Sequence, residues 1–199
     1  MSIRRMLRVA SIMLGSLGAK DLALAATGEL GENVEQARKT EFFRWFHLEE
    51  SGRTGSVVYF KPSAESFRSL VTVSLSLDSR ERLIGAELVL SRLFIDSGRD
   101  GLFARDIATS FLRVVTSAAE RQTIGGLVGE IEQPPASLST TLIVREQPAR
   151  RLPVAPSPGY GTFLGEQTHY EQSLPGGRIR LENLVVSGVP SLLIRRTGR

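Results

Sequence analysis

The chain contains no cysteine among its 199 residues. This absence excludes a disulfide framework and a cysteine-based zinc site, and it leaves no residue for the lipid attachment that follows a lipoprotein signal. A chain of this length can bury enough apolar surface to fold without cross-links. We therefore expect one domain held together by an ordinary hydrophobic core.

Histidine is also scarce, with His47 and His169 as the two examples in the chain. They lie far apart in sequence and have no histidine or cysteine neighbour at the spacing of a zinc site. Each is expected to be an ordinary strand residue. The sequence predicts no cofactor.

A calcium loop is the other metal site to consider, because acidic residues cluster around 96–106. Asp96 and Asp100 fit the first and fifth positions of an EF-hand loop, but Gly98 and Ile107 occupy two further positions that require oxygen ligands. We expect a strand-to-helix turn in which Asp100 caps the helix. A calcium site made of Asp96, Asp100 and Asp106 is the alternative.

A membrane-spanning apolar run is missing near the start of the chain. The run Val9–Ala19 has eleven residues, whereas a helix needs about 20 to cross a bilayer. Arginines precede this run, and the sequence Ala23-Leu24-Ala25 followed by Ala26 supplies small residues for a cleavage site. The pattern predicts a cleavable signal peptide over 1–25 and a periplasmic or secreted protein with no transmembrane segment after cleavage.

Excess charge of either sign is small once this segment is removed. The whole chain carries a formal charge of +4, but four basic residues and one acid lie in 1–25, which leaves 21 basic and 20 acidic residues. Nucleic-acid binding normally needs a concentrated basic face. We therefore expect no nucleic-acid partner.

Alternating apolar and polar residues predict antiparallel strands over 70–77 and 82–95, joined by a turn at 78–80. Turn-forming residues at 51–55 suggest a second hairpin within 41–60. Residues 26–40 are polar and begin with glycines, so we expect them to be flexible.

The apolar period changes to three and four residues from Asp100 onward. This spacing predicts the principal helix over about 100–118, with a weaker extension to 132 before Pro134. Glycines in the extension weaken it. Four prolines in 147–158 indicate a surface connection within one domain spanning 41–199.

Further strands are expected over 140–146, 160–172, 178–187 and 189–194, with a turn at 174–177. The fold class predicted from the whole pattern is α+β, with a mainly antiparallel sheet and the principal helix packed on one face.

An aromatic cluster lies just before the first hairpin turn, and it consists of Phe42, Phe43, Trp45 and Phe46. We favour a strand here because aromatic residues are enriched in strands. A helix over the same residues is the alternative. Core packing accounts for such a cluster, and a ligand groove or partner surface is its functional interpretation.

No catalytic motif is present: neither G-x-S-x-G, S-x-x-K nor a phosphate-binding glycine loop occurs. If the protein were a small periplasmic hydrolase, His169 would be the candidate base and Ser56 a candidate nucleophile. The favoured hypothesis is an exported, non-enzymatic module that binds a protein partner, an apolar ligand or the envelope surface. The sequence does not specify its oligomeric state.

Overall fold

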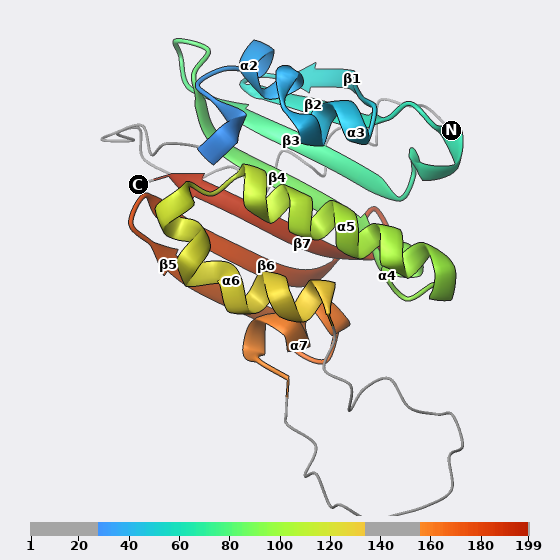
Figure 1. The fold of residues 1–199 in the computed structure, drawn as a ribbon. Coiled ribbons are helices and arrows are strands. Elements are labelled where there is room, and N and C mark those ends of the chain that lie inside the picture. Colours follow the sequence, from blue (N-terminus) through green and yellow to red (C-terminus); the bar gives the residue numbers. More distant parts are fainter. Residues whose placement is uncertain (1–27, 134–155, 199) are drawn as a thin grey trace, which may run out of the picture.

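The computed structural model describes residues 28–133 and 156–198, which form a seven-stranded antiparallel sheet with helices against one face (Figure 1). The α+β class predicted from the sequence is confirmed. The strand order is β1-β2-β3-β4-β7-β6-β5. The strands are β1 (Leu48–Thr54), β2 (Val57–Pro62), β3 (Val71–Leu77), β4 (Leu83–Ser91), β5 (His169–Leu174), β6 (Gly177–Val186) and β7 (Val189–Gly198). The α-helices are α2 (Val34–Lys39), α3 (Glu41–Trp45), α4 (Arg92–Ile95), α5 (Gly98–Val114), α6 (Ala118–Glu132) and α7 (Pro158–Leu164), and short 3-10 turns are η3 (Gly28–Leu30) and η4 (Glu65–Phe67).

The predicted hairpin of β3 and β4 is present, with Val73 paired to Leu88 and Leu75 paired to Ala86. These residues point to the helix side and are buried. After the helices, β7 returns to pair with β4 and joins the two halves of the sheet. The turn expected at 174–177 connects β5 to β6.

The core lies between the sheet and its helices. From α5, Ile107, Phe111 and Leu112 are fully buried in the same apolar cluster as Val73 and Leu88. The apolar stripe predicted from the three-and-four spacing is therefore the surface that packs on the sheet. The other face of α5 is left to solvent and to its neighbouring helices.

The predicted principal helix is divided in two. It begins earlier than expected, with Ser97 at the N-cap, so the assignment of Asp100 as the cap was wrong. It ends at Val114, and α6 starts afresh at Ser117, whose side chain and that of Glu120 form a reciprocal capping box. This pair of caps satisfies the first backbone N–H groups of α6, which explains why the helix restarts there.

The strand favoured over 41–50 was also wrong, because Glu41–Trp45 is helix α3 and β1 begins only at Leu48. Thr40 caps α3 through its side chain. His47, with φ 45°, redirects the chain from helix to strand. The hairpin around 51–55 does exist, but its two-residue turn lies at Gly55 and Ser56.

The stretch 26–40 was expected to be flexible, yet from Gly28 onward it forms η3 and α2 and contributes Leu30 and Ala37 to the core. The helix α2 is short and mostly polar, so its apolar contacts give no clear periodic signal. Its capping residue, Asn33, accepts a hydrogen bond from the Gln36 backbone.

Residues 160–172, predicted to be one strand, are instead the end of α7 followed by β5. Ser157 caps α7 and Pro158 occupies its first turn, where proline needs no backbone donor. The predicted strand 140–146 and most of the proline-rich connection 147–158 lie outside the described residues.

One ion pair is buried in the core. Glu120 and Arg196 are 2% exposed, and Nη2 of Arg196 donates to Oε1 of Glu120 over 2.8 Å. The same carboxylate accepts from the backbone N–H of Gly176 at 2.9 Å and of Ser117 at 3.0 Å. The pair therefore ties the start of α6 to β7 and to the β5–β6 turn.

Candidate functional site

The aromatic cluster 42–46 is split by helix α3 between core and solvent. Phe42, Phe43 and Phe46 are buried, and their rings contact other core rings such as Phe60 and Phe111. Trp45 is 77% exposed. Core packing thus accounts for three members of the predicted site, and Trp45 alone is available to a partner.

Trp45 and another exposed apolar residue, Leu102, lie on the contacting helices α3 and α5. The ring of Phe42 is 5.8 Å from that of Phe111, and Phe46 is 5.6 Å from Phe103, so α3 and α5 run antiparallel. Trp45 comes directly before Phe46 in the sequence, and Leu102 comes directly before Phe103. Because the two helices run antiparallel, the side chains of Trp45 and Leu102 point to the same side of the contact between Phe46 and Phe103, which here is the solvent side.

The other exposed apolar side chains lie at this same end of the sheet. We call it the apolar end, and define it as the end where β1, β3, β5 and β7 begin and β2, β4 and β6 finish. Within the described residues, the exposed large apolar side chains are Trp45, Leu93, Leu102, Val185, Val186 and Val189. Leu93 follows the end of β4, and the valines flank the β6–β7 turn, so all six belong to the apolar end (Figure 1).

The β6–β7 hairpin tip was not identified as a site from the sequence. Val186 pairs with Val189 across Ser187 and Gly188, which both have positive φ as in a tight two-residue turn. No charged residue occurs between Glu182 and Arg195. That charge-free stretch was the available signal, but a buried strand would give the same pattern.

A shallow hollow of about 430 Å³ lies next to the apolar end. It is lined by Ser51, Lys61, Glu65, Arg68 and Ser69. Lys61 is the last residue but one of β2, and the other residues from 65 to 69 belong to the η4 loop. The lining holds two cations, one carboxylate and two hydroxyls, and the exposed Glu49, which pairs with Lys61 in the strand register, supplies a second carboxylate beside it, so the charges here are balanced.

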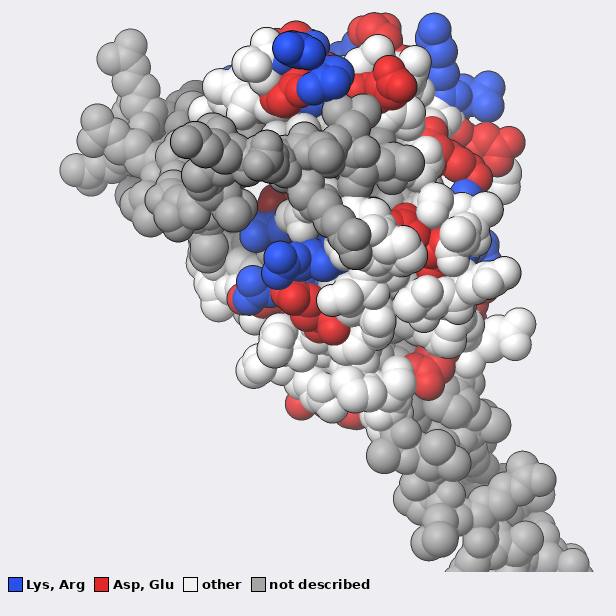
Figure 2. Space-filling model, turned by 90° about the vertical axis from the view of Figure 1, so that its left-hand side faces the viewer, with Lys and Arg blue, Asp and Glu red and all other residues white. Residues whose placement is uncertain are grey.

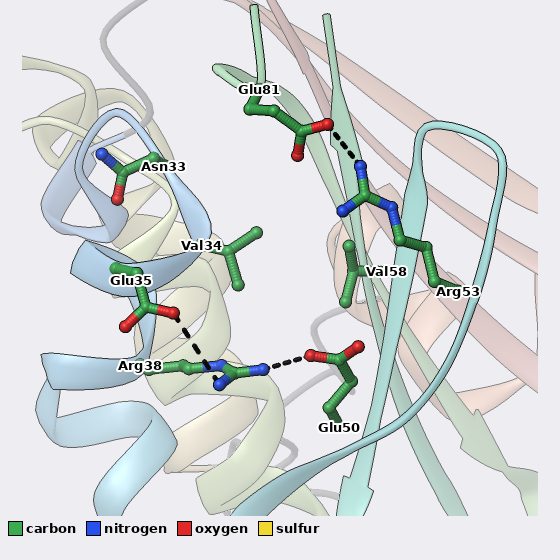
Figure 3. Close-up of a pocket in the computed structure, with 8 residues that line it drawn as sticks. All are labelled: Asn33, Val34, Glu35, Arg38, Glu50, Arg53, Val58 and Glu81. Carbon is green, nitrogen blue, oxygen red and sulfur yellow. Dashed lines mark hydrogen bonds and ion pairs between the residues drawn. The ribbon is translucent and has the colours of Figure 1, made fainter.

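The opposite end of the sheet is charged. Figure 2 looks onto this end, where basic and acidic side chains lie next to one another. A cleft of about 370 Å³ lies between α2 and the first strands. Figure 3 shows three ion pairs in it, Arg38 with Glu35 and with Glu50 on one side of Val34 and Val58, and Arg53 with Glu81 on the other. These arginines already have carboxylate partners, so the cleft presents matched charges.

The acidic residues proposed as a calcium site do not converge. Asp96 pairs with Arg92 at the end of α4, whereas Asp100 and Asp106 are exposed on α5. In the described part of the chain, no group of three acidic or histidine side chains is arranged to hold a metal ion.

His169 and Ser56 lie near opposite edges of the sheet. His169 begins the edge strand β5, and Ser56 is in the turn between β1 and β2. At least five strand spacings of about 4.8 Å separate them, or about 24 Å. The hydrolase dyad considered from the sequence cannot form, because a base must lie within hydrogen-bond reach of its nucleophile.

Comparison of the chain with models of protein families, with curated proteins and with solved structures gave no match. Among residues 28–133 and 156–198, no helix combines the length and the apolar character needed to cross a membrane.

Proposed function

We propose that the protein is an exported, non-enzymatic docking module that binds an apolar surface in the cell envelope through its apolar end. The observation that carries this proposal is the position of the exposed apolar side chains. Six of them come from α3, α4, α5 and the β6–β7 hairpin, and all gather at one end of the sheet.

Single exposed apolar residues are common on soluble proteins and need no explanation. A gathering of several such residues at one place is typical of a surface that is covered in use. The aromatic and aliphatic residues are 38–77% exposed, so a partner could remove much apolar area from water. Each fully buried side chain of this kind contributes about 1.5–3 kcal/mol.

Site-specific photo-crosslinking tests the proposal. A photoreactive amino acid replaces Trp45 in one variant and Ser79, an exposed residue of the β3–β4 turn at the charged end, in the matched control. Both proteins are produced in the cell envelope and irradiated. We expect adducts from position 45 and few or none from position 79.

Equal yields at the two positions, or no adduct at position 45, would contradict the proposal. A folding check by circular dichroism accompanies both variants. Since both replaced side chains are exposed, we expect their unfolding midpoints to match that of the unmodified protein.

A further inference from the structure

We infer that two copies of the chain pair through β5, the outer strand at one edge of the sheet, and form one continuous sheet about a twofold axis. The inference goes beyond the proposed docking function and does not depend on it. Because the two β5 strands would run antiparallel, the apolar ends of the two copies would point in opposite directions.

The two outer strands of the sheet, β1 and β5, differ in how their free edges are protected (Figure 1). Natural sheets protect such edges with bulges, proline or lysine, because unpaired backbone groups recruit other strands. In β1 an irregularity between Glu50 and Gly52 interrupts the regular pairing. By contrast, β5 pairs with β6 in unbroken register and contains neither proline nor lysine. The edge at β5 is therefore the one that can accept a further strand.

The hydrogen bonds of β5 leave every second residue with backbone groups that point to the free edge. The N–H of Asn183 in β6 donates to the carbonyl of Thr168 at 2.8 Å. Hydrogen-bonded pairs alternate along an antiparallel ladder, so every second residue from Thr168 onward is bonded to β6. The residues between them, His169, Glu171 and Ser173, direct their N–H and carbonyl groups outward. Within the described ranges, β6 is the only strand that pairs with β5.

One alignment of the two strands places Tyr170 opposite Tyr170 of the second copy. Each Tyr170 already pairs with Leu181 of β6, so an apolar row would cross the join on the helix side of the sheet. Tyr170 is half-buried, and the second ring would cover part of its exposed surface. The two tyrosines would form a pair without backbone hydrogen bonds, which is the kind in which side chains lie closest.

On the other face, the same alignment brings acidic and basic residues together. His169 would lie opposite Glu171 of the second copy, and the reverse contact would form across the axis. Within each copy, His169 pairs with Glu182 and Glu171 pairs with Arg180. The row across the join would therefore alternate between acidic and basic residues over four strands. Cross-strand pairs of this kind stabilise a sheet, and a histidine N–H can donate to a carboxylate in either protonation state.

The ion pairs already present leave room for these contacts. The carboxylate of Glu171 lies 3.3 Å from Nη1 of Arg178, whose side chain is 61% exposed. The carboxylate of Glu182 lies 3.2 Å from Nη2 of Arg180. A carboxylate has about four acceptor positions, so each of these groups can also accept a hydrogen bond from histidine.

The neighbouring alignments each have a defect. With Glu171 at the centre, it would face Glu171 of the second copy, and like charges directly opposite destabilise a sheet. With Gln172 at the centre, His169 would have to pair with Pro175, which has no N–H to donate. With His169 at the centre, most of each strand would extend past the other. The alignment centred on Tyr170 has none of these defects.

Cysteine cross-linking tests the alignment, and each introduced thiol is unique because the chain contains no cysteine. The purified variants His169→Cys and Glu171→Cys are mixed in equal amounts and mildly oxidised. Opposite Cα atoms in such a pair are about 5.5 Å apart, which is within disulfide range. We expect several-fold more disulfide-linked dimer from the mixture than from either variant alone. Glu49→Cys, an equally exposed position on the outer strand β1, is the matched control and should give little dimer.

A charge substitution tests the contact between His169 and Glu171. Glu171→Lys would place a cation opposite His169 of the second copy at both equivalent sites. We expect it to weaken dimerisation at least about tenfold in analytical ultracentrifugation over about 1–500 μM protein. The matched control Glu49→Lys makes the same change of charge on β1 and should leave dimerisation unchanged. Both side chains are exposed, so the unfolding midpoints of the two variants should match that of the unmodified protein.

The inference is wrong if the protein sediments as a monomer over the whole concentration range, or if the two lysine variants weaken dimerisation equally. Dimer that forms mainly from Glu171→Cys alone would indicate the alignment centred on Glu171 and would overturn the pairing of Glu171 with His169. As much dimer from Glu49→Cys as from the mixture would refute the choice of β5. The photo-crosslinking result at Trp45 is independent of these outcomes, so the two proposals can fail separately.

Discussion

Removing one partner of the buried ion pair should lower the free energy of unfolding more than any substitution at the surface. In Arg196→Met the carboxylate of Glu120 would stay in the core without its counter-charge. Breaking a buried pair from one side costs about 3–5 kcal/mol. Methionine is chosen because its unbranched, apolar side chain fills most of the space left by the arginine stem.

The structure shows why the loss should be large. The guanidinium also donates to the carbonyl of Val115 at 3.3 Å and to that of Thr197 at 2.6 Å. Burial lowers the pKa of Arg196, and the nearby carboxylate of Glu120 opposes this change. Two backbone donors, from Ser117 and Gly176, would remain on Glu120 and offset part of the cost. We therefore expect a loss of about 3 kcal/mol, at the lower end of the range.

The measurement is urea unfolding followed by circular dichroism. The neighbouring residue supplies the control: Arg195 points to the other face of the sheet, is 28% exposed in its side chain and pairs with Glu87. Arg195→Met should cost about 1 kcal/mol or less. The double variant Arg196→Met with Glu120→Leu should recover stability relative to Arg196→Met alone, because no unpaired charge remains. Equal losses for Arg195→Met and Arg196→Met would refute the reasoning.

Three further predictions follow from burial and local geometry. Phe43→Ala should lower the free energy of unfolding by about 3–5 kcal/mol because the Phe43 ring packs against the core. Trp45→Ser should change it by about 0.5 kcal/mol or less, because this side chain is exposed. Comparable losses for the two variants in urea unfolding would contradict the assignment of Phe43 to the core and Trp45 to the surface. Gly126→Ala should stabilise α6 by about 0.5–1 kcal/mol because the added methyl group meets nothing within 4 Å. Gly101→Ala should destabilise the protein because the new carbon would lie 2.6 Å from the carbonyl oxygen of Ile95. In thermal melts the unfolding midpoint should rise for Gly126→Ala and fall for Gly101→Ala, and shifts of the same sign would contradict the prediction. Burial raises the pKa of every tyrosine in the chain above 10.0. The stability that these tyrosines contribute is therefore fully present below pH 10 and is lost as the pH rises beyond it. An absorbance titration at alkaline pH should give a higher midpoint for the folded protein than for the protein in urea, and identical midpoints would exclude the effect.

Part of the sheet was predictable from the sequence, because the alternation of apolar and polar residues that marks a strand is contained within that strand. The alternation at Val71–Leu77 marks one buried face within a single strand, and its partner strand follows after a short turn. The aromatic cluster misled the prediction for the same reason. Two buried phenylalanines on one short helix and a third at its C-cap can resemble a strand, because five residues are too few to separate the two periods.

The candidate site was less predictable than the fold. The sequence drew attention to Trp45, but it gave no means of separating this residue from Phe42, Phe43 and Phe46. Leu93, Leu102 and the β6–β7 tip carried no motif. Their exposure depends on which side of each element packs on the sheet, and that is decided by residues distant in the chain.

By itself, the sequence determined the α+β class, the hairpin of β3 and β4 and the amphipathic α5, because each depends on periodicity within a short segment. The tertiary structure alone decided that α3 leaves its tryptophan in solvent and that exposed apolar residues from positions 45 to 189 meet at one end. It also decided that Glu120 and Arg196, 76 residues apart, share one buried site. The physical reason is that the burial of a side chain depends on which segments, distant in the sequence, pack against the same face of the sheet.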